Sequence, residues 1–486
     1  MAIIATSPES SVETAPGATA SVRSLIYVVL LASLAAYFLA WPIWRAQFLV
    51  EIWPTEGWNA YLQDAAATGR RLYPSADDLT GNNYPPLSFY AVGYLGKIFG
   101  DNLFVGRALS IVALFCVAGE IFLAVRVLTI STLGGFIGAL WYVAIMARNS
   151  TTYVGTNDPQ IAGEAIMGAA LVWFLSRYQK QESPLPPLLL MVLAGFWKHN
   201  MIAIPIATIA WLLYTNARQA AFPVLFSAVA AMAAVGVCAA VFGSDFLWDM
   251  LAVRQYGWSN VLGNVGHLQW SAAAFVIWLL WAISDRHSSA ARFTMLLVGT
   301  GLFACILQWF GHGVSGNAEF DLIIGLGIGI GVAFARIRTS WLANRIGVDR
   351  ARDVLIAILL LRLVLVDRQE TALLLLSPDF RAALHDRQTA LLKEAVIVSK
   401  IDGDVACSNK VVCRVAGKRF IVDEFKMEEL VATGRVTTAA VAAMLANRRI
   451  TSFVNAAPTR INIDTSFSSW LVKRSIAQRG VADVLF

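Results

Sequence analysis

The sequence predicts a mainly α, polytopic bundle of membrane-spanning helices followed by a small α/β domain at the C-terminus. Of the 486 residues, 57% are hydrophobic and only 14% are charged, whereas about a quarter of the residues of a soluble domain are charged. The hydrophobic residues gather in runs with few charges, each long enough or nearly so to cross about 30 Å of hydrocarbon as a helix. Water is therefore not the main solvent of this chain.

The N-terminus predicts a tail and then a retained membrane anchor. Residues 1–22 are rich in Ser, Ala, Thr and Pro and show no periodicity, so we expect a disordered tail on the cytoplasmic side. Arg23 then precedes an apolar stretch of about twenty residues, which is longer than the hydrophobic part of a usual signal peptide.

The region 23–366 is expected to form the membrane domain, with about eleven helices. The fifth and sixth helices are short and should form a tight hairpin. The expected helices are 24–43, 103–125, 133–147, 160–176, 185–197, 200–215, 220–242, 270–284, 292–310, 319–335 and 352–366.

Basic residues set the expected orientation, because Lys and Arg concentrate in cytoplasmic connections. With the N-terminus inside, each inner connection contains basic residues, and the net charge of +6 needs no nucleic-acid partner. These residues are Arg126, Arg177, Lys180, Arg218, Arg286, Arg292, Arg336, Arg338, Arg345, Arg350 and Arg352. The first loop (44–102), the turn at 149–158, the loop 243–269 and the C-terminal domain then lie outside.

The first outer loop contains two amphipathic patterns. Residues 58–69 and 86–99 are each expected to form a helix that lies on the membrane surface.

The C-terminal domain, 367–486, mixes helical patterns with short apolar runs typical of strands, as in a small α/β domain. The helices are expected at 427–433 and 437–447, and the strands at 395–398, 411–415, 419–422 and 450–454. Cys407 and Cys413 in this domain are either a disulfide on an oxidising outer face or two buried neighbouring thiols.

The first outer loop concentrates acids, amides and aromatics, and Glu56 is its main candidate for chemistry. Glu56 lies where the first amphipathic helix begins, so it could simply cap that helix or complement its dipole. Alternatively, it is a general base that takes the proton of an incoming hydroxyl while a lipid phosphate leaves a sugar with inversion. A glycosidase would need a second carboxylate flanking the bond.

Asp158 and Lys198 are the other charged candidates on the outer side. Asp158 precedes Pro159, so an N-cap role stands beside a catalytic or metal-binding one. Lys198 lies at the tip of the short hairpin, where it could bind a lipid-linked phosphate or extend to the interface. The polar residues expected to contact substrate around these three are Asn59, Tyr61, Asn82, Asn83, Tyr84, Asn157, Gln160, His199 and Asn200.

These motifs, in this order, resemble the GT-C class of bacterial membrane glycosyltransferases, the superfamily of protein mannosyltransferases and aminoarabinose transferases. The motifs are Glu56-Gly57-Trp58-Asn59-Ala60-Tyr61, the segment 82–90, Asn157-Asp158-Pro159-Gln160, Lys198-His199-Asn200 and the tail segment 416–423.

The resemblance implies a multi-pass protein of the inner membrane with its active site facing the periplasm. It implies a polyprenyl-phosphate-sugar donor and a lipid, glycan or protein acceptor. It also implies an active-site acid in the first outer loop, which we assign to Glu56. Many relatives have Asp or an Asp-Glu pair there, whereas this chain has Thr55 before Glu56, so Glu51 is kept in reserve. Asp158 matches a second outer acid that orients the acceptor or contributes to a divalent metal site.

Two other functions fit the same composition. A transporter or flippase for a glycolipid would use charges or broken helices near the bilayer midplane. The few ionisable residues inside the runs lie mostly near predicted helix ends, which favours chemistry at the surface. They are Arg107, Glu120, Glu164 and Asp321. A catalytically silent membrane scaffold is the third possibility.

Overall fold

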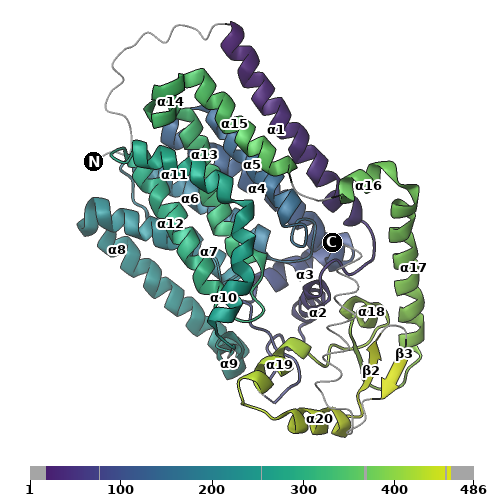
Figure 1. Ribbon diagram of the computed structural model, residues 1–486. Helices are drawn as coiled ribbons and strands as arrows, with labels where there is room; N and C mark the ends of the chain where they lie inside the picture. The colour runs from purple at the N-terminus through teal and green to yellow at the C-terminus, as the bar shows by residue number, and fades with distance from the viewer. Residues whose placement is uncertain (1–17, 76, 253, 366–368, 455–456, 461–486) are drawn as a thin grey trace.

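The computed structural model describes residues 18–460 except 76, 253, 366–368 and 455–456, and it is built mainly of helices. Most of the predicted N-terminal tail and the last part of the C-terminal domain lie outside the described residues. Figure 1 shows a bundle of long helices with α1 along one side, and α17 to α20 with the strands at one end of the bundle.

The helices of the bundle agree closely with the predicted apolar runs. The sixth and seventh runs form two helices that share the label α8 and are separated by a kink at Asn216, where φ is −158° and ψ is 81°. The bundle helices are α1 (Ala18–Arg45), α4 (Asn102–Thr129), α5 (Thr132–Asn149), α6 (Gln160–Gln179), α7 (Leu185–Trp197), α8 (Ala203–Phe242), α11 (Ala272–Ser284), α12 (Ser289–Trp309), α13 (Phe320–Ala335) and α15 (Val348–Val364).

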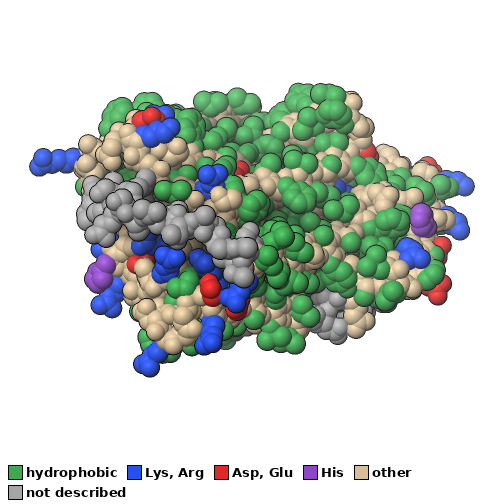
Figure 2. Space-filling view, turned by 90° about the horizontal axis from the view of Figure 1, so that it is seen from above, with side chains coloured by type: hydrophobic (Ala, Val, Ile, Leu, Met, Phe, Trp, Pro, Cys, Tyr) green, Lys and Arg blue, Asp and Glu red, His purple; other side chains and the backbone are tan. Residues whose placement is uncertain are grey.

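Five of the described helices are long and apolar enough to cross a membrane, and a bent pair around Ser271 makes a possible sixth. The total of about eleven crossings therefore stays a prediction. Large hydrophobic side chains on α8, such as Val229, Met232 and Val241, are exposed. In Figure 2 hydrophobic side chains cover much of the middle of the molecule and charged ones gather toward its ends, as lipid contact requires.

Helix α13 is the centre of the bundle, and every one of its residues except Ala335 is buried. It packs against α5, α12, α4 and α11. Glycines allow the closest of these contacts: a Cβ on Gly138 of α5 would lie 2.3 Å from the carbonyl oxygen of Gly327. Close approach of backbones over small residues is the usual way in which membrane helices associate.

The first loop forms α2 (Thr55–Thr68) and α3 (Leu87–Phe99). The prediction that the 58–69 helix lies on the membrane surface is wrong, because most of α2 is buried beneath α3 and the C-terminal segment. A Cβ on Gly57 would lie 2.5 Å from the Cβ of Lys410, so α2 and α18 are in tight contact. Helix α3 does expose apolar residues, including Ile98 and Phe99.

The connections from α8 to α11 and from α12 to α13 contain short elements. These are α9 (Ser244–Met250), α10 (Trp258–Asn264) and the 3-10 helices η1 (Val265–Trp270) and η2 (Gly316–Glu319). On the opposite side, the connection between α13 and α15 contains η3 (Ile337–Thr339) and α14 (Trp341–Ile346).

The C-terminal segment combines helices with a small sheet. Its elements are α16 (Glu370–Leu376), α17 (Pro378–Ser399), β1 (Val405–Cys407), α18 (Lys410–Val415), α19 (Glu424–Ala432), α20 (Thr438–Asn447), β2 (Thr451–Val454) and β3 (Ala457–Arg460). β2 lies between β1, which is parallel to it, and β3, which is antiparallel.

The predicted helices and the last predicted strand are present, but the other three predicted strands are wrong. Residues 395–398 continue α17, 411–415 lie in α18, and 419–422 form no strand. Helix α18 forms because the Asn409 side chain accepts hydrogen bonds from the backbone N–H groups of Val411 and Val412. A disulfide joins Cys407 of β1 to Cys413 of α18, which decides between the two alternatives left open by the sequence.

Candidate active site

The predicted site residues divide into a closed polar network around Glu56 and residues that line an open cavity. Glu56 has no solvent exposure. Its Oε1 accepts from Arg107 Nε at 2.8 Å and from Asn157 N at 2.9 Å. Its Oε2 accepts from Arg107 Nη2 at 2.7 Å and from Ile52 N at 2.8 Å. Both carboxylate oxygens thus accept two hydrogen bonds each.

This geometry makes Glu56 a structural anion. Four donors, two of them from a guanidinium, occupy both carboxylate oxygens, and the side chain has no exposed surface through which an acceptor could reach it. Arg107 also donates to the carbonyl oxygens of Phe48 at 2.6 Å and Val50 at 2.5 Å, so the pair joins α4 to the chain that enters α2. The expected role of Glu56 as the general base therefore has no geometric support.

Two predicted substrate residues belong to the same closed network. Asn59 donates from Nδ2 to the carbonyl oxygen of Asn157 at 2.9 Å. The Asn157 amide pairs with that of Gln63 through two hydrogen bonds of 2.9 Å. A Cβ on Gly106 would lie 1.9 Å from Asn157 Oδ1, so the backbone of α4 packs against this amide pair with no room for a side chain. These amides hold the turn before α6 against α2.

Tyr61, also predicted to contact substrate, fastens the C-terminal segment instead. Its hydroxyl donates to the carbonyl oxygen of Lys418 at 2.9 Å, and its ring stacks on Phe420 with centroids 5.4 Å apart. Arg414 strengthens the same contact through ion pairs with Asp64 and Asp101.

Asp158 and Lys198 form a second buried ion pair, with 2.9 Å between Lys198 Nζ and Asp158 Oδ1. Asp158 Oδ1 also accepts from Gln160 N at 2.8 Å, although Pro159 and not Asp158 occupies the N-cap position of α6. Burial works to lower the pKa of Lys198, but Asp158, with Tyr84 and Tyr153, raises that pKa above its usual value. Lys198 is therefore charged and already neutralised.

The remaining predicted residues surround this ion pair. Lys198 Nζ lies 4.6 Å from the centre of the Tyr84 ring, and the exposed His199 meets the edge of the same ring. Gln160 donates to Glu164 at 2.7 Å, and Asn200 donates to Gln308 at 3.0 Å. Tyr84 thus separates the Asp158–Lys198 pair from the open cavity.

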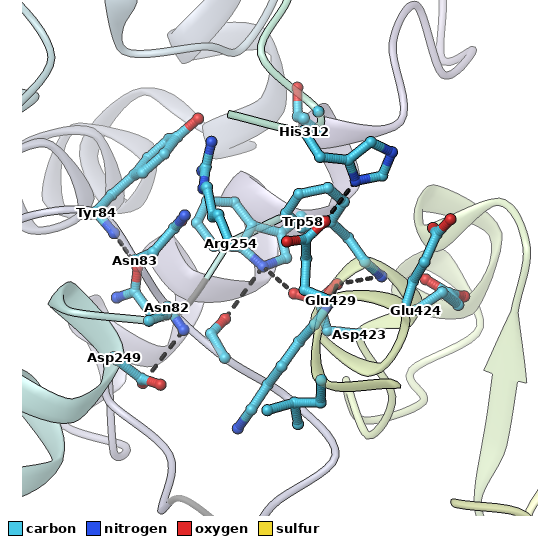
Figure 3. A pocket seen from close by; sticks show the side chains of 18 of the residues that line it. Trp58, Asn82, Asn83, Tyr84, Asp249, Arg254, His312, Asp423, Glu424 and Glu429 are labelled. Atoms are coloured by element: carbon cyan, nitrogen blue, oxygen red, sulfur yellow. Dashed lines mark hydrogen bonds and ion pairs between the residues drawn. The ribbon is translucent and has the colours of Figure 1, made fainter. Parts of the chain in front are cut away.

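The cavity has a volume of about 480 Å³ and lies between the first loop, the α9–α10 connection and the C-terminal segment. Figure 3 shows side chains from all three regions facing it. Aromatic side chains make up much of its wall, namely Trp53, Trp58, Tyr84, Trp248 and Phe425. Of the predicted site residues, Asn82, Asn83 and Tyr84 line it.

Hydrogen bonds fix the wall nearest the first loop. Trp58 Nε1 donates to the carbonyl oxygen of Gly81 at 3.3 Å and to Asp423 Oδ2 at 3.1 Å. The backbone N–H of Asn82 donates to Asp249 Oδ2 at 3.2 Å, and Asn82 Oδ1 accepts from Tyr84 N at 3.0 Å. Burial raises the pKa of Asp249 to about 7.

The opposite wall contains charged residues that the sequence did not single out as site residues. Arg254, His312 and Glu429 line the cavity, and His312 Nδ1 is hydrogen-bonded to Glu429 Oε1. Arg254 forms no ion pair with any residue that the structure describes, and its guanidinium carbon lies 5.7 Å from the centre of the Phe425 ring. These residues come from distant segments, so no local motif could have grouped them.

Candidate metal ligands are sparse. Within the described ranges, no three His, Cys, Asp or Glu side chains come together as a metal site would require. The divalent metal considered for Asp158 thus has no ligand set there.

Comparison with solved structures identifies the fold. The structure of ArnT from Cupriavidus metallidurans bound to undecaprenyl phosphate is similar to this one. The alignment covers 88% of this chain and 93% of the ArnT chain, with 14% sequence identity and a TM-score of 0.52. The alignment with the apo structure of the same ArnT covers 90% of this chain and 93% of the ArnT chain, with 13% sequence identity and a TM-score of 0.52. No protein-family model and no curated protein matches the sequence. The expected GT-C-like helical bundle is thereby confirmed as a fold.

Proposed function

We propose that this chain is a membrane glycosyltransferase that moves a sugar from a polyprenyl-phosphate donor to an acceptor hydroxyl. The observation that carries the proposal is the aromatic and charged cavity at one end of a bundle with the fold of ArnT, which has been crystallised with undecaprenyl phosphate. The ring faces of Trp58, Tyr84 and Phe425 suit the apolar faces of a sugar, and amides and charged groups beside them suit its hydroxyls.

Arg254 is the proposed binding group for the donor phosphate. It lines the cavity and has no carboxylate partner among the described residues, whereas Lys198 is paired with Asp158. A guanidinium can donate two parallel hydrogen bonds to a phosphate and stabilise the charge that develops as the phosphate leaves. The Asp158–Lys198 pair would then hold the Tyr84 ring in place from the side away from the cavity.

The disulfide supports an outer-face location for the cavity. Disulfides persist in oxidising compartments such as the bacterial periplasm, and the Cys407–Cys413 bond lies in the segment that closes the cavity. The basic inner connections support the same orientation. Transfer would thus occur at the periplasmic side of the inner membrane, with inversion if the acceptor displaces the phosphate in one step.

A transporter or flippase for a lipid-linked sugar is the second candidate. It is favoured by Glu164 and Asp321, which are buried within α6 and α13. The carboxyl groups of Glu164 and Asp321 lie within hydrogen-bond reach of each other, and buried acids in a membrane often mark transport pathways.

The test is sugar transfer by the purified protein. It would be incubated with a panel of radiolabelled polyprenyl-phosphate sugars and a membrane extract that supplies lipid, glycan and protein acceptors. Arg254→Ala should raise the KM for the donor at least about tenfold, because a charged hydrogen bond to phosphate is lost. Arg345→Ala is the matched control, since Arg345 likewise packs on an aromatic ring, that of Trp341, but does not line the cavity.

Three outcomes separate the candidates. Transfer that depends on Arg254 supports the proposal. Equal transfer by the two arginine variants overturns the role of Arg254. Movement of the lipid-linked sugar across vesicles without transfer to any acceptor favours the transporter and overturns the proposed enzyme.

A further inference from the structure

His312 and Glu429 form a pair that the sequence motifs do not include. His312 Nδ1 is hydrogen-bonded to Glu429 Oε1, and Glu429 Oε2 accepts from Gln255 N at 2.7 Å. The Glu429 side chain is 5% exposed and the His312 side chain is 35% exposed. The carboxylate is therefore held in place, while the imidazole lines the cavity (Figure 3).

The backbone places His312 beside the proposed phosphate-binding residue. His312 N donates to the carbonyl oxygen of Gln255 at 2.8 Å, so the two chain segments run next to each other. The Phe425 ring contacts both side chains: the His312 ring stacks on it at 5.9 Å and 15°, and Arg254 lies 5.7 Å from its centre. Gly313, with φ of +74°, makes room, because a Cβ there would lie 2.4 Å from the Phe425 ring.

We propose that His312 is the general base of the transfer, with Glu429 as its positioning residue. The inference rests on the proposed function and names the group that takes the acceptor's proton. A carboxylate at Nδ1 selects the tautomer with the proton on that nitrogen, which leaves Nε2 as the acceptor. Arg254, on the segment beside it, packs on the same Phe425 ring as the His312 imidazole. Further charged residues that line the cavity are Lys410, Asp423, Glu424, Lys426, Glu428 and Arg435.

The proposed transfer needs no group beyond the acceptor, the donor and the residues of the cavity. The acceptor O–H bond breaks and its proton moves to His312 Nε2, while the acceptor oxygen forms a bond to C1 of the sugar. The bond between C1 and the phosphate oxygen breaks, and its electron pair leaves with the polyprenyl phosphate. Arg254 stabilises that leaving phosphate, and the proton on His312 then passes to solvent.

Three other carboxylates, the two proposed from the sequence and Asp249, are less suited to the role. Glu56 accepts four hydrogen bonds, and Asp158 is paired with Lys198. Asp249 is 2% exposed and already accepts from the backbone of Asn82. His312 combines access to the cavity with a fixed orientation, as a general base requires.

The inference gives the C-terminal segment a direct part in the site. Helix α19 contains Glu429, which orients the His312 imidazole. It also contains Phe425, whose ring contacts both His312 and Arg254. The segment that carries the disulfide would therefore be required for the chemical step itself.

The experiment compares His312→Gln with His267→Gln in the transfer assay. His267 is the matched control, because its Nδ1 lies 3.5 Å from Glu319 Oε1 and its ring packs near Trp309, away from the cavity. His312→Gln should lower kcat at least about 100-fold, as expected for loss of a general base. Its affinity for radiolabelled undecaprenyl phosphate should stay within about threefold of that of the unmodified protein.

Two further readouts exclude a merely structural effect. The kcat of the unmodified protein should fall as the pH is lowered, because a protonated base cannot accept the acceptor's proton, and His312→Gln should lack this dependence. Added imidazole should restore part of its activity. If His312→Gln does not fold, Glu429→Gln should instead shift the pH at which kcat falls.

The result that overturns the inference is equal kcat for His312→Gln and His267→Gln, or a pH dependence that neither His312→Gln nor Glu429→Gln alters. Such a result leaves the proposed function intact, because the unmodified protein would still transfer sugar. Failure of the unmodified protein to transfer any sugar would overturn both.

Discussion

The closed network around Glu56 and the cavity around Arg254 are built from similar groups but differ in what those groups contact. In the network, the charges of Glu56 and Arg107 are satisfied within the protein, and both side chains are almost fully buried. In the cavity, Arg254 has no carboxylate partner among the described residues and His312 remains partly exposed. Charge in a membrane protein thus serves two purposes here: a fully paired group fixes the fold, and an incompletely paired group is available to a substrate.

The most severe test of this comparison is Arg107→Met. It removes one partner of a buried ion pair and leaves Glu56 charged without compensation, which costs about 3–5 kcal/mol. The protein should unfold at a much lower denaturant concentration, as followed by tryptophan fluorescence in detergent. Arg177→Met is the control, because the Arg177–Glu182 pair is much more exposed and should contribute less than about 1 kcal/mol. Similar losses for the two variants would contradict the structural role of the network.

Glu56→Gln distinguishes a structural carboxylate from a catalytic one. The amide oxygen still accepts hydrogen bonds from Arg107, so we expect a loss of stability of about 2 kcal/mol. Transfer activity per mole of folded protein should stay within about threefold of normal, whereas loss of a general base would lower it roughly 100-fold. An unchanged unfolding transition combined with the larger loss of activity would restore Glu56 as the base.

The sequence predicted the helices well because their signals are local. Apolar runs set the bounds of α4 and α13 to within a few residues. The strand predicted at 411–415 failed because an Asn409 cap outweighed the β-branched residues after it. The sheet that does form needs pairing between β1 and β2, which no short window of sequence contains.

The candidate site was predicted only where its residues are neighbours in sequence. Asn82, Asn83 and Tyr84 follow one another, and all three line the cavity. His312 and Glu429 are 117 residues apart, so their pairing depends on how the C-terminal segment packs. The ion pair of Glu56 could not be predicted for the same reason, since its partner Arg107 lies 51 residues along the chain.

The smallest expected effect concerns Asp249, which lies between the two kinds of environment because it lines the cavity yet is almost fully buried. Burial raises the pKa of this carboxyl from 3.8 to about 7. Between these pH values the unfolded chain releases the proton before the folded protein does, so this group lowers the stability of the fold progressively as pH rises. Above about pH 7 the loss is complete, and below about pH 3.8 it is absent.

Asp249→Asn should therefore melt at a higher temperature than the unmodified protein at pH 8, by about 2 °C, and the difference should shrink as the pH is lowered toward 4. The amide oxygen of Asn can still accept the hydrogen bond from Asn82 N, so that contact need not be lost. The measurement is the melting midpoint by intrinsic fluorescence at one scan rate, with Asp402→Asn as the control at an exposed carboxylate. A difference independent of pH would mean that Asp249 is ionised as easily as a surface carboxylate and belongs to a fully solvated cavity wall.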